Sequence, residues 1–155
     1  MFSVDELIYN MHHFEEENFE RFDELYDEVR AGNLSTEEDA VKKLCLSFAE
    51  EFQQIHPHQY VKAVKITFMI IQRMGTEEGF RQLAEGLCGL PAEKESHVHE
   101  YIKCLCYNYP KEELEKFKII LNQQPQNEVV WRAIRKVCES EHKKLDAARE
   151  VFGEN

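Results

Sequence analysis

Apolar residues recur at helical spacing along almost the whole chain, and short chain-breaking signals separate one helical stretch from the next. Val41, Leu44, Cys45 and Phe48, for example, fall on one face of a helix, because a helix completes a turn in about 3.6 residues. No stretch alternates apolar and polar residues between hairpin turns, as a half-buried strand does. The sequence therefore predicts an all-α fold.

The chain breakers divide the sequence into seven or eight helices. Ser3 with Glu6, and Ser35 with Glu38, have the spacing of capping boxes, which begin helices. Short connections favour antiparallel neighbours, so we expect helical hairpins that form a bundle or a short array of helical repeats (an α-α superhelix). Paired helices begin near residues 36, 76 and 110, at intervals typical of helical-repeat proteins. Breaks are expected at Gly32, residues 56–58, Gly75, residues 89–91, Pro110 and residues 122–125.

The last segment carries Trp131, followed by Ala148 within the stretch Leu-Asp-Ala-Ala-Arg-Glu-Val-Phe at residues 145–152. This pattern resembles one unit of the tetratricopeptide or half-a-tetratricopeptide class, in which an aromatic residue on one helix packs against a small alanine on the next. The resemblance covers about one-seventh of the chain. It implies a protein-binding scaffold and a break in the last segment at residues 141–143.

Negative charge is concentrated at the start of the chain. The net charge is −11, and residues 1–30 alone hold ten acidic and two basic residues. We expect residues 1–32 to form one long acidic amphipathic helix within a single domain that spans residues 1–155. The charge argues against direct binding of nucleic acid, which requires a basic surface to contact phosphates.

The first segment also holds the candidate partner-binding surface. Phe22 and Tyr26 share a face with Leu25 and Val29 and are expected in the core. Phe19 points elsewhere, among the acids, and an exposed aromatic residue in an acidic field is typical of a binding surface. The predicted partner-binding residues are Glu16, Phe19, Glu20, Asp23, Glu24 and Asp27.

No catalytic or metal-binding motif is present, so no enzyme activity, cofactor or metal is predicted. Gly-rich phosphate loops, nucleophile elbows and His-Glu-x-x-His are all absent. Cys104 and Cys106 lack the two-residue spacing of a redox motif. Glu139 and His142 form the chain's one Glu-x-x-His pair, on one face of a helix, and a di-metal bundle needs two such pairs. The histidine pairs at 12 and 13, 56 and 58, and 97 and 99 are expected to be exposed or to cap helices.

Cysteine usage and hydropathy indicate the compartment. Five cysteines at irregular spacing do not suit a disulfide framework, and the N-terminus has no signal-peptide pattern. The longest strongly apolar run, residues 68–71, is too short to span a bilayer. We expect a reduced, cytoplasmic protein with no membrane partner.

These observations favour a non-enzymatic protein–protein interaction module that uses its acidic, aromatic-bearing first helix. The expected partner is another protein with a basic surface, and a homodimer that uses the basic last segment is an alternative. A second hypothesis is an acidic inhibitor or immunity-type protein that blocks a basic nucleic-acid-handling enzyme. A third is a helical-bundle metal-dependent enzyme that uses Glu139 and His142.

Overall fold

The computed structural model describes residues 3–12, 16–32, 39–50 and 57–153. Within these ranges every regular element is a helix, which confirms the all-α prediction. None of the helices described is both long and apolar enough to cross a membrane. The described elements are α1 (Val4–His12), α2 (Glu16–Ala31), α3 (Ala40–Glu50), α4 (Pro57–Met74), α5 (Thr76–Cys88), α6 (Glu95–Asn108), α7 (Lys111–Asn122), α8 (Glu128–Cys138) and α9 (Asp146–Phe152), with short 3₁₀ helices at Ala92–Lys94 and Lys143–Leu145.

The described residues thus hold nine α-helices where seven or eight were expected, because the first segment divides. Instead of one long helix over residues 1–32, α1 and α2 are separate and pack against each other. Leu7 of α1 and Phe22 of α2 are both fully buried, and folding back brings both apolar stripes onto one core. The Arg21 guanidinium joins the two helices through Glu6, with Nη2 2.6 Å from Oε1.

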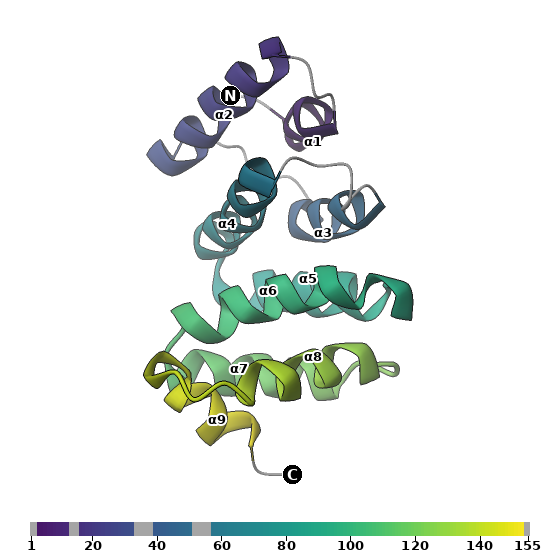
Figure 1. The fold of residues 1–155 in the computed structure, drawn as a ribbon, viewed down its shortest axis with the longest axis vertical. Helices are drawn as coiled ribbons and strands as arrows, with labels where there is room; N and C mark the ends of the chain where they lie inside the picture. Colours follow the sequence, from purple (N-terminus) through teal and green to yellow (C-terminus); the bar gives the residue numbers. More distant parts are fainter. Residues whose placement is uncertain (1–2, 13–15, 33–38, 51–56, 154–155) are drawn as a thin grey trace.

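Each helix packs against the second helix along the chain. α1, α3, α5, α7 and α9 form one series of neighbours, and α2, α4, α6 and α8 form the other. Figure 1 shows the helices stacked along the long axis of the molecule, with the two ends of the chain at opposite ends of the stack. Helices of the first series begin at residues 4, 40, 76, 111 and 146, so their starts are 35 or 36 residues apart.

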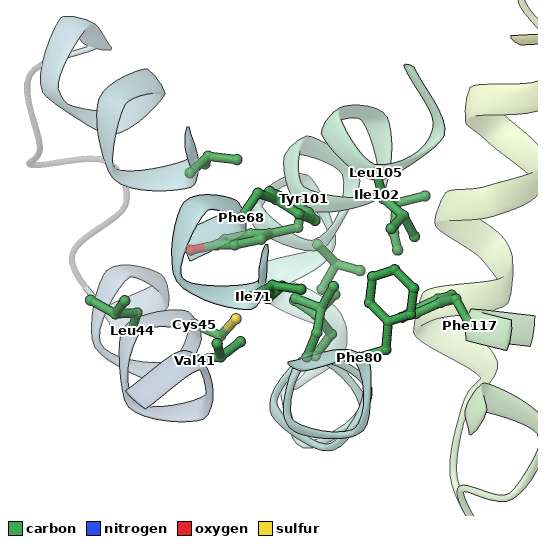
Figure 2. Packing of buried hydrophobic residues seen from close by; sticks show 14 of the residues in the cluster. Val41, Leu44, Cys45, Phe68, Ile71, Phe80, Tyr101, Ile102, Leu105 and Phe117 are labelled. Atoms are coloured by element: carbon green, nitrogen blue, oxygen red, sulfur yellow. The ribbon is translucent and has the colours of Figure 1, made fainter. Parts of the chain in front are cut away.

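A continuous apolar core runs through the stack (Figure 2). At its centre the Phe80 ring meets Phe117 edge-on, with ring centroids 5.5 Å apart, and meets Tyr109 at 5.3 Å. These aromatic contacts join α5 to α7 and to the end of α6. Other members include Val41, Leu44 and Cys45 of α3, Phe68 and Ile71 of α4, and Tyr101, Ile102 and Leu105 of α6.

Two glycines shape the junction between α4 and α5. Gly75 adopts φ 98°, a left-handed conformation that L-residues disfavour, and it ends α4 at the predicted break. Gly79 lies inside α5, where a Cβ atom would stand 2.6 Å from Cγ2 of Ile71. The missing side chain therefore allows α5 to approach α4 closely.

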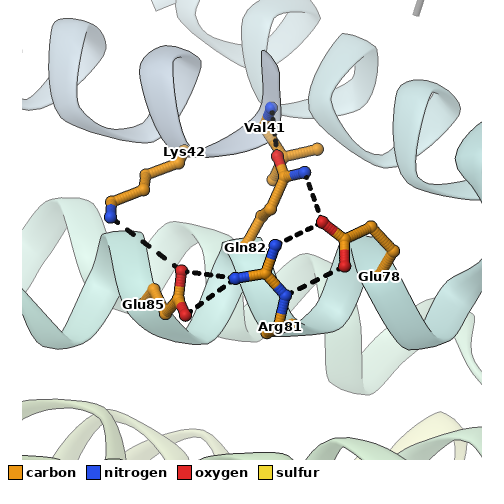
Figure 3. Close-up of polar contacts among 6 residues, drawn as sticks. All are labelled: Val41, Lys42, Glu78, Arg81, Gln82 and Glu85. Carbon is orange, nitrogen blue, oxygen red and sulfur yellow. Dashed lines mark hydrogen bonds and ion pairs between the residues drawn. The ribbon is translucent and has the colours of Figure 1, made fainter. Parts of the chain in front are cut away.

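A buried glutamine connects α5 to the beginning of α3 (Figure 3). The backbone N–H of Val41 donates to Oε1 of Gln82 at 3.1 Å, and Gln82 Nε2 donates to Glu78 Oε1 at 3.0 Å. Arg81 forms ion pairs with Glu78 and Glu85 along the same side of α5. The cap expected for this helix, Ser35 with Glu38, lies outside the described residues. At the start of α1 the Glu6 N–H does donate to Ser3 Oγ, at 3.2 Å, as a capping box predicts.

The last segment breaks between α8 and α9, as the tetratricopeptide-like pattern implies. Residues 139–142 separate α8 from the 3₁₀ turn at Lys143–Leu145, and α9 follows directly. The Trp131 ring of α8 meets Phe152 of α9 edge-on, with centroids 5.8 Å apart, and Ala148 is fully buried. The Trp131 ring therefore packs against α9 through Phe152.

Candidate functional site

The predicted partner-binding residues with described side chains lie together on the outside of α2. Glu20, Asp23, Glu24 and Asp27 are all exposed, and their spacing of three or four residues places them on neighbouring turns of one side of the helix. We call these four residues the acidic face. The side chains of two further predicted residues, Glu16 and Phe19, lie outside the described part of the structure.

The opposite side of α2 packs on the core. Phe22 and Leu25 are fully buried, Val29 is nearly so, and Tyr26 packs against them, as the apolar spacing predicts. α2 holds seven acidic residues and two arginines over its whole length. One of these, Arg21, is shared between Glu6 and Glu24, at 2.6 and 3.1 Å. The exposed side of the helix therefore carries a strong excess of negative charge.

Besides Arg21 of α2, which pairs with Glu24, a lysine of the neighbouring helix approaches the acidic face. Lys62 of α4 places Nζ 2.6 Å from Oδ1 of Asp23 and 5.2 Å from the centre of the Tyr26 ring. Figure 1 shows α8 and α9 at the far end of the stack from α2. Within the described residues Glu20 and Asp27 form no ion pair.

His97 is not exposed, contrary to expectation, but fully buried. Its Nε2 lies 3.0 Å from the carbonyl oxygen of Cys45, which can only accept, so Nε2 carries the proton. Nδ1 of the neutral ring then accepts from the Tyr60 hydroxyl at 2.8 Å. Burial lowers the pKa of His97 to about 4, which keeps the ring neutral near pH 7. The ring therefore has a structural role, linking α3, α4 and α6.

A second buried polar contact joins α4 and α6. The Thr67 hydroxyl donates to the carbonyl of Ala63 at 3.0 Å, so the Tyr101 hydroxyl is the donor in its 3.0 Å contact with Thr67 Oγ1. Burial raises the pKa of the nearby Cys45 thiol to about 12. A protonated thiol is a poor nucleophile, and the hydrogen bonds of these buried groups hold the helices in position.

Two of the remaining histidines have described side chains. His142 Nδ1 accepts from the backbone N–H of Lys144 at 3.1 Å and so caps the 3₁₀ turn, although no cap was predicted at this position. His99 is partly exposed on α6. The side chains of His12, His13, His56 and His58 lie outside the described part of the chain.

The Glu139 and His142 pair does not have the helical geometry expected of a metal site. α8 ends at Cys138, so Glu139 caps that helix while His142 begins the next turn, and both side chains are exposed. In the part of the chain that the structure describes, no three His, Cys, Asp or Glu side chains are placed to hold one metal ion. The hypothesis of a di-metal bundle therefore loses the helix-face pair on which it rested.

All five cysteines are free. Cys104 is partly buried and Cys106 is buried, and burial raises the pKa of Cys104 to about 11. Burial likewise raises the pKa of Cys88 to about 11. These two thiols are protonated near neutral pH, and a protonated thiol is a poor nucleophile.

The sequence interpretation missed a surface between α4 and α6. A cavity of about 210 Å³ opens there, and we call it the α4–α6 groove. Val61 has helical spacing with the buried Val64 and Phe68 of the same helix, but its side chain is 52% exposed at this groove. The sequence held one signal of this surface. α4 has apolar residues on more than one face, whereas a helix that packs through a single face needs only one apolar stripe. The groove is lined by Tyr60, Val61, Val64 and Lys65 of α4 and by Glu100, Lys103, Cys104 and Tyr107 of α6.

Comparison of the chain with models of protein families, with curated proteins and with solved structures finds no significant match.

Proposed function

We propose that this chain is a non-enzymatic protein-binding scaffold, a short α-α superhelix of stacked helical hairpins. The support is the regular interval of 35 or 36 residues between helix starts, together with the contacts between every second helix. Helical-repeat proteins have this period and this nearest-neighbour packing, and they use their extended helical surfaces to bind other proteins.

The partner-binding surface in this proposal is the acidic face of α2. One observation carries it: four exposed acids share one side of a helix whose other side is fixed to the core. A fixed helix presents its charges in a constant arrangement, which favours electrostatic recognition of a protein with a basic surface. Since such contacts are exposed, the association should weaken as salt screens the charges.

Charge reversal tests this proposal. Glu20→Lys with Asp27→Lys changes two acids that form no ion pair among the described residues, so the fold should persist. Glu112→Lys with Glu115→Lys is the matched control, because these acids are exposed on α7. We expect wild type and control to retain a protein partner at about 50 mM salt and to lose it at several hundred millimolar, where the Debye length falls below about 8 Å. The α2 variant should lose that partner even at low salt, and an unchanged set of partners would contradict the assignment.

The acidic-inhibitor hypothesis uses the same face and makes a separate prediction. If the partner is a nucleic-acid-handling enzyme, double-stranded DNA should displace the chain from it, because DNA phosphates and the acidic face would compete for one basic surface. Retention of the partner in saturating DNA would leave the scaffold proposal intact and exclude the inhibitor.

A further inference from the structure

The α4–α6 groove has an apolar lining at the surface of the molecule. Val61 is 52% exposed, while Tyr60 and Val64 beneath it are each only 6% exposed. Tyr107 and Cys104 line the α6 side. An apolar cavity that opens to solvent costs free energy unless a ligand covers it, so this lining is a candidate binding surface.

The floor of the groove is held in place by hydrogen bonds. The Tyr60 hydroxyl is fixed by His97, which is fixed in turn by the Cys45 carbonyl, at 2.8 and 3.0 Å. On the other wall Asn108 Nδ2 donates to the Cys104 carbonyl at 2.8 Å. A cavity with fixed walls is formed before a ligand arrives, which lowers the entropy cost of binding.

The rim of the groove carries positive charge. Lys65 and Lys103 are exposed on its two sides, and neither forms an ion pair within the described residues. α4 contains no acidic residue at all, and its other lysine, Lys62, is already paired with Asp23. Glu100, half-buried, is the one acid that lines the groove.

The next helix of the same series, α8, also carries exposed basic residues. A neighbouring cavity of about 190 Å³ between α6 and α8 shares Glu100 with the groove and is lined by Glu95, His99 and Lys136 as well. Arg135 is exposed on α8 as well, whereas Arg132 lies 3.9 Å from Glu95. Lys65, Lys103 and Lys136 therefore place one exposed lysine on each of α4, α6 and α8.

We propose that the α4–α6 groove binds an acidic peptide segment that inserts one apolar side chain between the two helices. Its carboxylates would meet Lys65 and Lys103, and the segment would continue across the stack toward Lys136. Packed helices lie about 8–10 Å apart, and an extended peptide advances about 3.3 Å per residue. Acidic residues about three positions apart in the peptide would thus reach lysines on successive helices.

This binding site is independent of the acidic face. The two surfaces lie on different helices and select partners of opposite charge, so either assignment can fail while the other holds.

Three synthetic peptides of equal length test the proposal: an acidic peptide with a central leucine, the same peptide with serine in its place, and a lysine-rich peptide with the leucine. Each is titrated into the isotopically labelled full chain and followed by amide chemical shifts. We expect the acidic leucine peptide alone to shift the groove amides of Val61, Val64, Cys104 and Tyr107, with a Kd of about 1 mM or tighter.

Variants then test the role of each charge. Lys65→Glu with Lys103→Glu should weaken the acidic leucine peptide by about ten-fold or more, and Glu100→Gln should tighten it. Val61→Ser removes the apolar lining at a half-exposed position and should also weaken binding. Lys143→Glu, an exposed lysine outside the groove, is the matched control and should leave the Kd unchanged.

Four outcomes would overturn the proposal. The first is equal binding of all three peptides, and the second is a set of shifts that maps outside the groove. The third is a change in the chemical shifts of the groove amides that depends on protein concentration and not on peptide, which would mean that a second copy of the chain binds in the groove. The fourth is no shift with any peptide up to about 10 mM, which is weaker than specific recognition requires.

Discussion

Replacing Gln82 with leucine should destabilise the fold although leucine is the more apolar residue. Val41 lies in the first turn of α3, where a backbone N–H has no partner within its own helix. The Gln82 side chain, only 2% exposed, supplies that partner from α5. Leucine fills similar space but cannot accept the hydrogen bond. A buried N–H left without a partner costs about 1–3 kcal/mol, and the added apolar burial offsets part of this, so we expect a net loss of about 1–2 kcal/mol.

Urea unfolding followed by far-ultraviolet circular dichroism measures this loss. For a chain of this length the same change should lower Tm by roughly 2–8 °C. Glu78→Gln is the control: it removes the exposed ion pair with Arg81 and alters the second partner of Gln82, but it leaves the Val41 hydrogen bond in place, so it should cost under about 1 kcal/mol. If Gln82→Leu is as stable as the wild type, or more stable, then loss of the hydrogen bond to the Val41 N–H does not destabilise the fold, and the reasoning is wrong.

Two further predictions concern buried contacts. Gly79→Ala should destabilise by about 1–2 kcal/mol despite alanine's higher helix propensity, because the new Cβ would meet Ile71 Cγ2 at 2.6 Å. Ile71→Leu moves the side-chain branch from Cβ to Cγ, so the double variant Gly79→Ala with Ile71→Leu should recover part of the lost stability. If the unfolding free-energy changes of the two single variants simply add, the contact with Ile71 is not the cause. The pKa of His97 is about 4 in the folded chain, because burial disfavours the charged ring, against an ordinary value of 6.5. The unfolded chain therefore binds more protons between pH 6.5 and 4, and the free energy of unfolding should fall by up to about 1.4 kcal/mol per pH unit as the pH drops through this window. Urea unfolding at several pH values gives the free energy of unfolding as a function of pH, and in His97→Gln this dependence should be weaker. An equal pH dependence in the wild type and the variant would refute the assignment to His97.

The helix boundaries followed from local signals in the sequence. Gly75 ends α4 because glycine adopts the left-handed conformation needed there, and α7 begins immediately after Pro110, which suits the position before a first helical turn. The break before α9 has no glycine or proline and was predicted from the tetratricopeptide-like pattern instead. The division of the first segment into α1 and α2 was not predicted, because apolar residues recur at helical spacing on both sides of the polar residues 15–18 and we interpreted the interruption as part of one helix.

Features that depend on tertiary neighbours were beyond the reach of local patterns. The exposure of Glu20 and Asp27 could be anticipated, since acids opposite an apolar stripe face solvent. The burial of His97 could not, because its partners Tyr60 and Cys45 lie 37 and 52 residues away. The α4–α6 groove could not be predicted either, because it depends on how α6 packs beside α4. Val61 has the spacing of a core residue, and only the placement of α6 leaves its side chain uncovered.

The packing of each helix on the second helix along the chain has a consequence for how the molecule opens. Contacts are local in sequence, so helices at either end can detach without breaking the middle of the stack. Amide hydrogen exchange should then form a gradient, fastest in α1, α2 and α9 and slowest in α5 and α6. The Gln82–Val41 hydrogen bond joins α3 to α5, one of the central helices. Its loss should therefore speed amide hydrogen exchange in the helices before α5 and leave exchange in α7 and α8 unchanged.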